Sequence, residues 1–141
     1  RRSSDLRELA EQFCDVQFYS AKKLDELRGC FPSRGETGVM LCLLRRSGPA
    51  LSGELAKKTG LSSGRMANIL SSLEKKGFIR RETDLLDRRQ VFVYLTQDGE
   101  HSIIKTYDDA IDYYEKFLES LGEEDALAAV RILKKAVKFS E

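Results

Sequence analysis

The sequence contains few of the residues that build metal sites and disulfides. Its 141 residues include one histidine, His101, and three cysteines, Cys14, Cys30 and Cys42. The number of cysteines is odd, and no two of them have the CxxC spacing of a zinc ligand pair. This scarcity argues against a disulfide framework and against a Cys/His zinc site. We therefore expect reduced thiols, no metal ion and no cofactor.

Long apolar runs are also missing. No stretch approaches the roughly 18 consecutive apolar residues of a membrane span, and residues 1–5 lack the apolar stretch of a signal peptide. With 41% hydrophobic residues, the chain suits one compact domain with its own core. We expect a single domain over residues 1–141 and a cytoplasmic location.

Catalytic patterns are absent as well. The sequence has neither a glycine-rich phosphate loop nor a Ser-His-Asp arrangement. Its carboxylates are scattered over predicted helix faces, where solvated charge is the ordinary explanation. We do not expect an enzyme.

Charge is distributed unevenly along a chain whose net charge is only +1. Residues 52–95 carry nine Lys/Arg against five Asp/Glu, which gives +4, whereas residues 96–141 carry six against eleven, which gives −5. Residues 1–51 are closer to balance, with nine against seven. Because DNA phosphates attract local positive charge, the pattern favours a basic DNA-facing module on an acidic base, although chance clustering would give the same counts.

Two helices are predicted in the first third of the chain. Apolar residues step by three or four through residues 5–28 without a proline, which predicts one amphipathic helix ended at Gly29. Proline and glycine break the pattern over residues 30–35. It resumes over Glu36–Arg46, with four apolar residues on one side: Val39, Met40, Leu43 and Leu44.

Two shorter helices follow across a tight turn. Ser52 is a candidate N-cap for a helix through Thr59, and Gly60 suits the position after its last turn. A second cap is available in residues 61–64. From there apolar residues recur at helical spacing until Gly77, namely Met66, Ile69, Leu70 and Leu73.

Residues 78–83 and 90–96 are rich in β-branched and aromatic residues, which predicts two strands. The segment between them is polar at its ends and basic where it enters the second strand, which predicts an antiparallel hairpin with a projecting tip. Helical periodicity returns over residues 97–121, and three acids open a last helix at residue 123. We expect that helix to turn four apolar residues inward: Leu127, Val130, Leu133 and Val137. The predicted fold class is mainly α with a small β-hairpin wing.

This order of elements is typical of a winged helix-turn-helix, in which the last helix before the wing enters the major groove of DNA. Arg65 can donate two hydrogen bonds to guanine, and Asn68 can pair with an adenine edge. The hydroxyl groups of Ser62 and Ser63 can reach a phosphate or a base near the positive end of the helix. Gly64 keeps the first turn slim. The alternative is that the serines only cap the helix and Arg65 is a solvated charge.

The predicted hairpin tip has its own DNA-binding candidates. Asp87 can orient one guanidinium while the other arginine of the Arg88–Arg89 pair projects toward the narrow minor groove. The alternative is an ordinary solvated turn. Outward residues of the recognition helix and its neighbours are candidate phosphate contacts, of which we single out Ser52, Ser72, Lys75 and Arg80.

At this point the sequence resembles the MarR family of bacterial transcription regulators. The resemblance spans most of the chain, and its specificity lies in the wing. The matching stretches are Leu51–Ala56, Gly60–Ser62, Leu73–Arg81, Asp87–Thr96 and Asp98–Gly99. The sequence departs from the family pattern at the hairpin tip, where Leu85 and Leu86 stand in place of the proline and polar residues that family wings often carry.

The resemblance implies a homodimeric repressor on a pseudo-palindromic operator. Residues 5–28 and 97–139 would form dimerisation helices, and residues 36–96 the winged helix-turn-helix. Arg89 would enter the minor groove, Asp87 would steady it, and Arg88 would lie on the backbone. The family commonly releases DNA when a small aromatic or anionic effector binds.

Two alternatives remain at this stage. Family members also respond to cysteine oxidation, and Cys14 in the first helix has a context similar to that of the peroxide-sensing branch. However, the pair of tyrosines that this branch presents after its first helix is absent. The other alternative is a winged helix that serves as a protein-interaction adaptor, whose recognition face would carry acids or exposed apolar groups.

Overall fold

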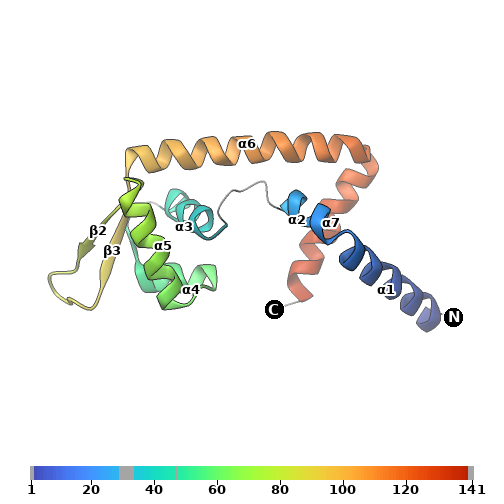
Figure 1. The fold of residues 1–141 in the computed structure, drawn as a ribbon, viewed down its shortest axis with the longest axis horizontal. Helices are drawn as coiled ribbons and strands as arrows, with labels where there is room; N and C mark the ends of the chain where they lie inside the picture. Colours follow the sequence, from blue (N-terminus) through green and yellow to red (C-terminus); the bar gives the residue numbers. More distant parts are fainter. Residues whose placement is uncertain (1, 29–33, 47, 140–141) are drawn as a thin grey trace. The chain divides into compact units, whose positions relative to one another are not determined.

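The computed structural model describes residues 2–28, 34–46 and 48–139, shown as a ribbon in Figure 1. The chain divides into two compact units, Arg1–Arg34 and Gly35–Glu141. Within the described ranges, no helix combines the length and the apolarity needed to cross a bilayer.

The first unit contains α1 (Arg2–Tyr19) and α2 (Ala21–Arg28), separated by Ser20. The single helix predicted over residues 5–28 is therefore wrong in detail. The helical bonding nevertheless passes through the break, since the Ser20 N–H donates to the Val16 carbonyl at 3.1 Å and the Leu24 N–H to the Ser20 carbonyl at 2.8 Å. Serine is a weaker helix former than alanine or leucine, so a local turn here costs little. The predicted stop at Gly29 lies outside the described residues, as does Cys30.

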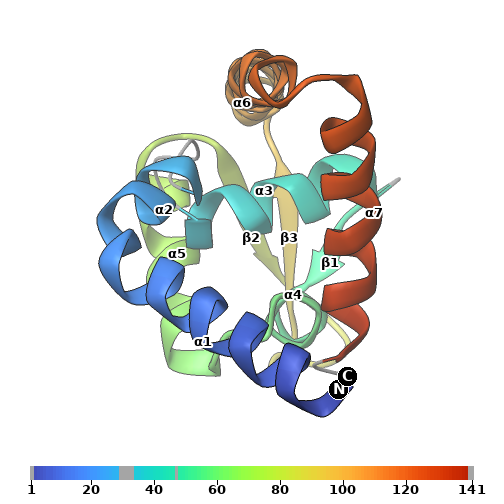
Figure 2. The same ribbon diagram turned by 90° about the vertical axis from the view of Figure 1, so that its right-hand side faces the viewer.

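The second unit contains α3 (Arg34–Arg45) from its second residue onward, β1 (Ala50–Leu51), α4 (Ser52–Thr59) and α5 (Ser63–Lys75), followed by β2 (Ile79–Thr83) and β3 (Val91–Leu95). The three strands form one antiparallel sheet in the order β1-β3-β2, which Figure 2 shows face on. The hairpin β2–β3 was predicted to within a residue or two at each end. Strand β1 was not, because two residues are too few to show an alternation.

Side chains from all these elements meet in one core. Val39 of α3, Leu73 of α5 and Val93 of β3 are completely buried, and Ile103 from the helix after β3 is 1% exposed. The predicted inward faces of residues 36–46 and of α5 are thus confirmed. The remaining buried members of this cluster are Met40, Leu43, Ala50, Leu55, Met66, Leu70 and Ile79.

The helix ends follow the expected chemistry with one exception. Gly60 ends α4 with a φ of 71°, a left-handed conformation that side chains disfavour, as predicted. Ser62 caps α5, as expected. Ser52 does not cap α4, because strand β1 runs up to Leu51 and Leu51 itself occupies the cap position without a side-chain hydrogen bond.

Two long helices complete the chain, α6 (Gln97–Leu121) and α7 (Glu123–Phe139), as predicted. Gly122 joins them, and α7 turns back at the far end of α6 (Figure 1). The expectation that α7 turns its apolar residues inward is wrong for one chain, because none of its residues is buried and Leu127, Leu133 and Val137 are 68%, 66% and 58% exposed. Helix α1 exposes Leu6, Leu9, Phe13 and Val16 in the same way.

The junction between the sheet and α6 is closely packed around Gly99. Its N–H donates to the Thr96 hydroxyl at 3.0 Å, which caps α6. A Cβ at Gly99 would lie 2.0 Å from the carbonyl oxygen of Phe78 and 2.9 Å from Leu95 Cδ1. Only glycine permits this approach of α6 to the backbone that enters β2.

We predict that Gly99→Ala lowers the free energy of unfolding by about 1–3 kcal/mol, the usual cost of forcing extra atoms into a packed core. Urea unfolding monitored by circular dichroism measures it. Gly53→Ala in α4 is the control, because its Cβ would meet nothing within 4 Å. Equal stability of the two variants would contradict this account of the junction.

Candidate nucleic-acid interface

Helix α5 has two chemically distinct faces. Met66, Leu70 and Leu73 are at most 2% exposed and attach the helix to the core. The opposite side is exposed and contains no large apolar residue. We call this the reading face and define it by Gly64, Arg65, Asn68, Ser71 and Lys75.

The first turn of α5 is open to solvent. The Ser62 hydroxyl oxygen accepts a hydrogen bond from the Arg65 N–H at 3.2 Å, so the capping role considered from the sequence is confirmed. Ser63 is exposed as well, and a Cβ at Gly64 would meet no atom within 4 Å. This turn therefore presents small side chains and the positive end of the helix dipole to the outside.

Ser72 does not belong to the reading face, contrary to the prediction that it points outward. It is half-buried, and its hydroxyl donates to Glu36 Oε1 at 2.6 Å, while Lys76 Nζ contacts Glu36 Oε2 at 2.6 Å. Sequence reasoning missed Glu36, because nothing in the spacing connects residues 36 positions apart. The Glu36 carboxylate thus fixes the first turn of α3 to the last turns of α5.

The environment of Glu36 shifts its acidity. Burial by itself raises the pKa of the carboxyl group, but the hydrogen bonds from Lys76 and Ser72 and the Lys76 charge outweigh it, so the pKa lies below its ordinary value of 4.5. The Glu36 side chain is 16% exposed, so this pair is better shielded from water than an ordinary surface ion pair.

Ion pairs also connect α5 to β2. Arg81 donates from Nε and from one terminal nitrogen to the two carboxylate oxygens of Glu74, at 3.2 and 3.0 Å. This fork lowers the pKa of Glu74 and raises that of Arg81. Arg80, a candidate phosphate contact, pairs with Glu82, and its guanidinium lies 4.1 Å from the centre of the Tyr94 ring. The positive charge of Arg80 is therefore already partly balanced by the Glu82 carboxylate.

The loop between β2 and β3, residues 84–90, is here called the wing tip. It is closed by the Asp84 N–H, which donates to the Gln90 carbonyl at 2.9 Å. Asp87 Oδ1 accepts from the Arg89 N–H at 3.1 Å and from Arg89 Nε at 3.4 Å, so the predicted orienting contact is confirmed with Arg89 as the partner. The Arg89 side chain remains 93% exposed, and Arg88 is exposed too.

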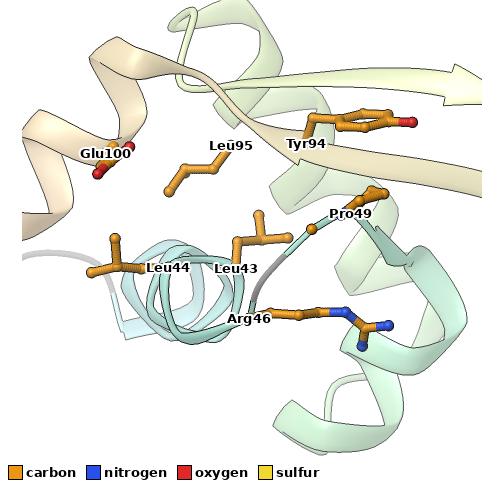
Figure 3. A pocket seen from close by; sticks show the side chains of 8 residues that line it. Leu43, Leu44, Arg46, Pro49, Tyr94, Leu95 and Glu100 are labelled. Carbon is orange, nitrogen blue, oxygen red and sulfur yellow. The ribbon is translucent and has the colours of Figure 1, made fainter.

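A cavity of about 250 Å³ lies between α3, β3 and the start of α6 (Figure 3). Arg46 stands at its edge and forms an ion pair with Glu54 at 2.6 Å. The cavity thus combines apolar walls with the Arg46 guanidinium and the Glu100 carboxylate. Its other lining residues are Leu43, Leu44, Gly48, Pro49, Tyr94 and Leu95.

Comparison with known proteins finds a family match for part of the chain. Residues 37–91, which run from α3 to the first residue of β3, match the sequence model of the MarR family. This stretch of the chain resembles a MarR-family domain. Over 60 residues the chain is 45% identical to YcgE of Bacillus subtilis, named an uncharacterized HTH-type transcriptional regulator, with 42% of this chain and 39% of YcgE aligned. Over 103 residues it is 29% identical to the transcriptional repressor NicR of Pseudomonas putida, with 73% of this chain and 65% of NicR aligned. The chain thus matches less than two thirds of either relative.

Solved structures confirm the winged-helix fold. The MarR regulator AbsC from Streptomyces coelicolor superimposes with a TM-score of 0.68 at 20% identity, covering 94% of this chain and 92% of AbsC. The regulator PcaV from Streptomyces coelicolor, solved in complex with its natural ligand, gives 0.64 at 17% identity and covers 77% of each chain. At these identities the likeness concerns the fold alone.

The cysteines of this chain lie in different surroundings. Cys14 is an exposed free thiol on α1, and Cys42 is half-buried in α3. Exposure meets one of the two requirements for a redox sensor, so that role stays a prediction. Among the described residues, no three metal-binding side chains gather in one place.

We predict that Glu36→Gln lowers the free energy of unfolding by about 1–2 kcal/mol at neutral pH, because Lys76 loses its charged partner. Since the folded pKa of Glu36 is depressed, its contribution is present above the unfolded pKa near 4.5 and is lost as the pH falls through the folded value. Unfolding curves between pH 7 and pH 3 should therefore converge for the wild type and the variant. Glu115→Gln, exposed on α6, is the control; parallel curves for Glu36→Gln would contradict the assignment.

Proposed function

We propose that this chain is a sequence-specific regulator of transcription that binds double-stranded DNA through α5 and the wing tip. The observation that carries the proposal is the reading face of α5, which is exposed and polar while the opposite face is locked into the core. A helix held in this way can enter a major groove without uncovering its own apolar side chains.

The proposed base contacts lie in the first two turns of α5. Arg65 donates to guanine and Asn68 pairs with adenine, the side-chain and base combinations that fit bidentate hydrogen bonding. The serines at the helix start reach phosphate oxygens, helped by the helix dipole, and Gly64 lets the backbone come close. Lys75 and, more weakly, Ser52 and Arg80 extend the phosphate contacts. The Ser72 hydroxyl is already bonded to Glu36, which makes its contact the least favourable of the set.

The proposed minor-groove contact is Arg89. Narrow minor grooves concentrate negative potential, and an exposed guanidinium that Asp87 holds at the root enters one with little loss of freedom. Arg88 then lies beside the sugar-phosphate backbone. The +4 charge of residues 52–95 supports this placement.

We further propose that the chain acts as a homodimer through its terminal helices. Helix α7 has no buried residue, and α1 exposes six large hydrophobic side chains, so both present surfaces that a two-fold partner can cover symmetrically. Such a dimer presents two α5 helices to a pseudo-palindromic operator.

The proposed outcome is repression, relieved by a small effector in the cytoplasm. NicR is named a repressor, and PcaV was solved with a natural ligand. In this chain the cavity at Arg46 is a candidate effector site. At about 250 Å³ it lies below the roughly 300–1,000 Å³ of drug-sized sites, which favours a single-ring compound.

We predict that Arg65→Ala weakens binding to a duplex selected from a random library by about ten- to a hundredfold and relaxes base preference at one position, since one bidentate contact is worth about 1–3 kcal/mol. Arg89→Ala weakens binding without that relaxation. Fluorescence anisotropy on matched and single-mismatch duplexes measures both. The control is Lys105→Ala, which removes one exposed cation from α6. Undiminished binding by both arginine variants would refute the assigned contacts of α5 and the wing tip, and failure of the wild type to select any duplex would favour the adaptor role.

Analytical ultracentrifugation tests the dimer. The purified chain should sediment at about twice its 16.0 kDa monomer mass at micromolar concentration. Leu133→Glu should shift it toward the monomer, because a charge in an apolar interface is left without a partner. The exposed wing-tip variant Gln90→Glu is the control and should leave the mass unchanged. A wild-type monomer would contradict the proposed interface.

A further inference from the structure

We infer that the wing tip is an apolar wedge, in which Leu85 and Leu86 enter the minor groove and partly unstack one base step. This inference rests on the proposed function and adds a second recognition mode to it. Leu85 is 95% exposed and Leu86 is 98% exposed, and among the described residues the next most exposed large hydrophobic side chains are Phe139 at 95%, Tyr19 at 88% and Phe18 at 80%. The two leucines therefore contribute nothing to the core. Exposing apolar surface to water is unfavourable, and no packing contact within the chain offsets it for these two side chains.

The backbone around the leucines is held in place. The Leu86 N–H donates to Asp84 Oδ1 at 2.9 Å, and the Asp84 N–H closes the loop to the Gln90 carbonyl. Three residues later, Asp87 forms the same kind of turn with the Arg89 N–H. Two side-chain turns in succession present the leucines on an ordered loop, and an ordered loop can press apolar groups between bases without first losing much freedom.

The charges of the tip indicate what covers the leucines. Arg88 and Arg89 belong to the same closed loop, and both are exposed. The loop also contains Asp84 and Asp87, so its net charge is zero, but both carboxylates are half-buried and accept hydrogen bonds within the loop, and the exposed charges are the two guanidinium groups. A second copy of this tip would bring those guanidinium groups together. DNA supplies phosphates for them and stacked bases for the leucines. Proteins that bind the minor groove do insert leucine or similar side chains between base steps, which bends the duplex by about 20–90°.

The wedge has a consequence for specificity. Unstacking is least costly at pyrimidine–purine steps such as TA and CA, because these steps are the most deformable. The bound sequence should therefore carry such a step under each wing, at a position that no side chain reads by hydrogen bonding. The preference for one base step over another would come from how easily the duplex deforms there. Insertion of the leucines would make binding tighter at the steps that deform most easily.

The test uses the full chain and the duplex selected from a random library, with 2-aminopurine placed at the flanking step. Wild type should raise the 2-aminopurine fluorescence and bend the duplex, as measured by energy transfer between its ends. The double variant Leu85→Ser/Leu86→Ser should lose both signals and bind about tenfold more weakly. The control Leu85→Met/Leu86→Met keeps an apolar tip and should retain them.

The outcomes separate the two proposals. Failure of wild type to select any sequence overturns both the proposed function and the wedge. Specific binding by wild type with unchanged bending and fluorescence in the serine variant overturns the wedge alone. A change of sedimentation mass in the serine variant also overturns it, because the leucines would then contact a second copy. Thermal unfolding should be the same for all three proteins, since the leucines touch no core residue.

Discussion

Everything that we propose for α5 depends on how that helix is held. Leu73 is completely buried against the core, and Glu36 fixes the end of the helix from α3 through Ser72 and Lys76. Arg81 adds a third attachment through Glu74. Because apolar packing holds one face of the helix, and the ion pair and the guanidinium fork hold its C-terminal end, the reading face can remain polar and unpacked. A reading helix needs this division, since it must keep its position while its exposed side chains exchange water for bases.

The same constraint explains why the wing can carry exposed side chains. Strand β3 lies between β1 and β2 and contributes the fully buried Val93, so the hairpin is anchored at its base. Beyond that anchor, the turns at Asp84 and Asp87 order the tip without any packing. The tip is thus free to present arginine and leucine together, one suited to phosphate-rich grooves and the other to base faces.

Much of this architecture could be predicted from the sequence, and the misses have physical causes. The buried face of α5, the cap at Ser62 and the hairpin follow from local periodicity and turn chemistry, and the structure confirms them. The terminal helices were correctly expected as helices, but periodicity only says that a face is apolar, and cannot say whether this chain or another covers it. Ser72 and Glu36 were misjudged because their hydrogen bond joins distant parts of the chain. The base contacts of Arg65 and Asn68 stay predictions.

The most direct measurement is a hydroxyl-radical footprint of the chain on its selected duplex. The account predicts two protected tracts about one helical turn apart, related by a two-fold axis, with further protection in the flanking minor grooves where the wings lie. Uniform protection along the duplex, or protection of a single tract without flanks, would contradict it. The first result would mean that only phosphate charge is recognised, and the second that α5 and the wing do not act together in a symmetric pair.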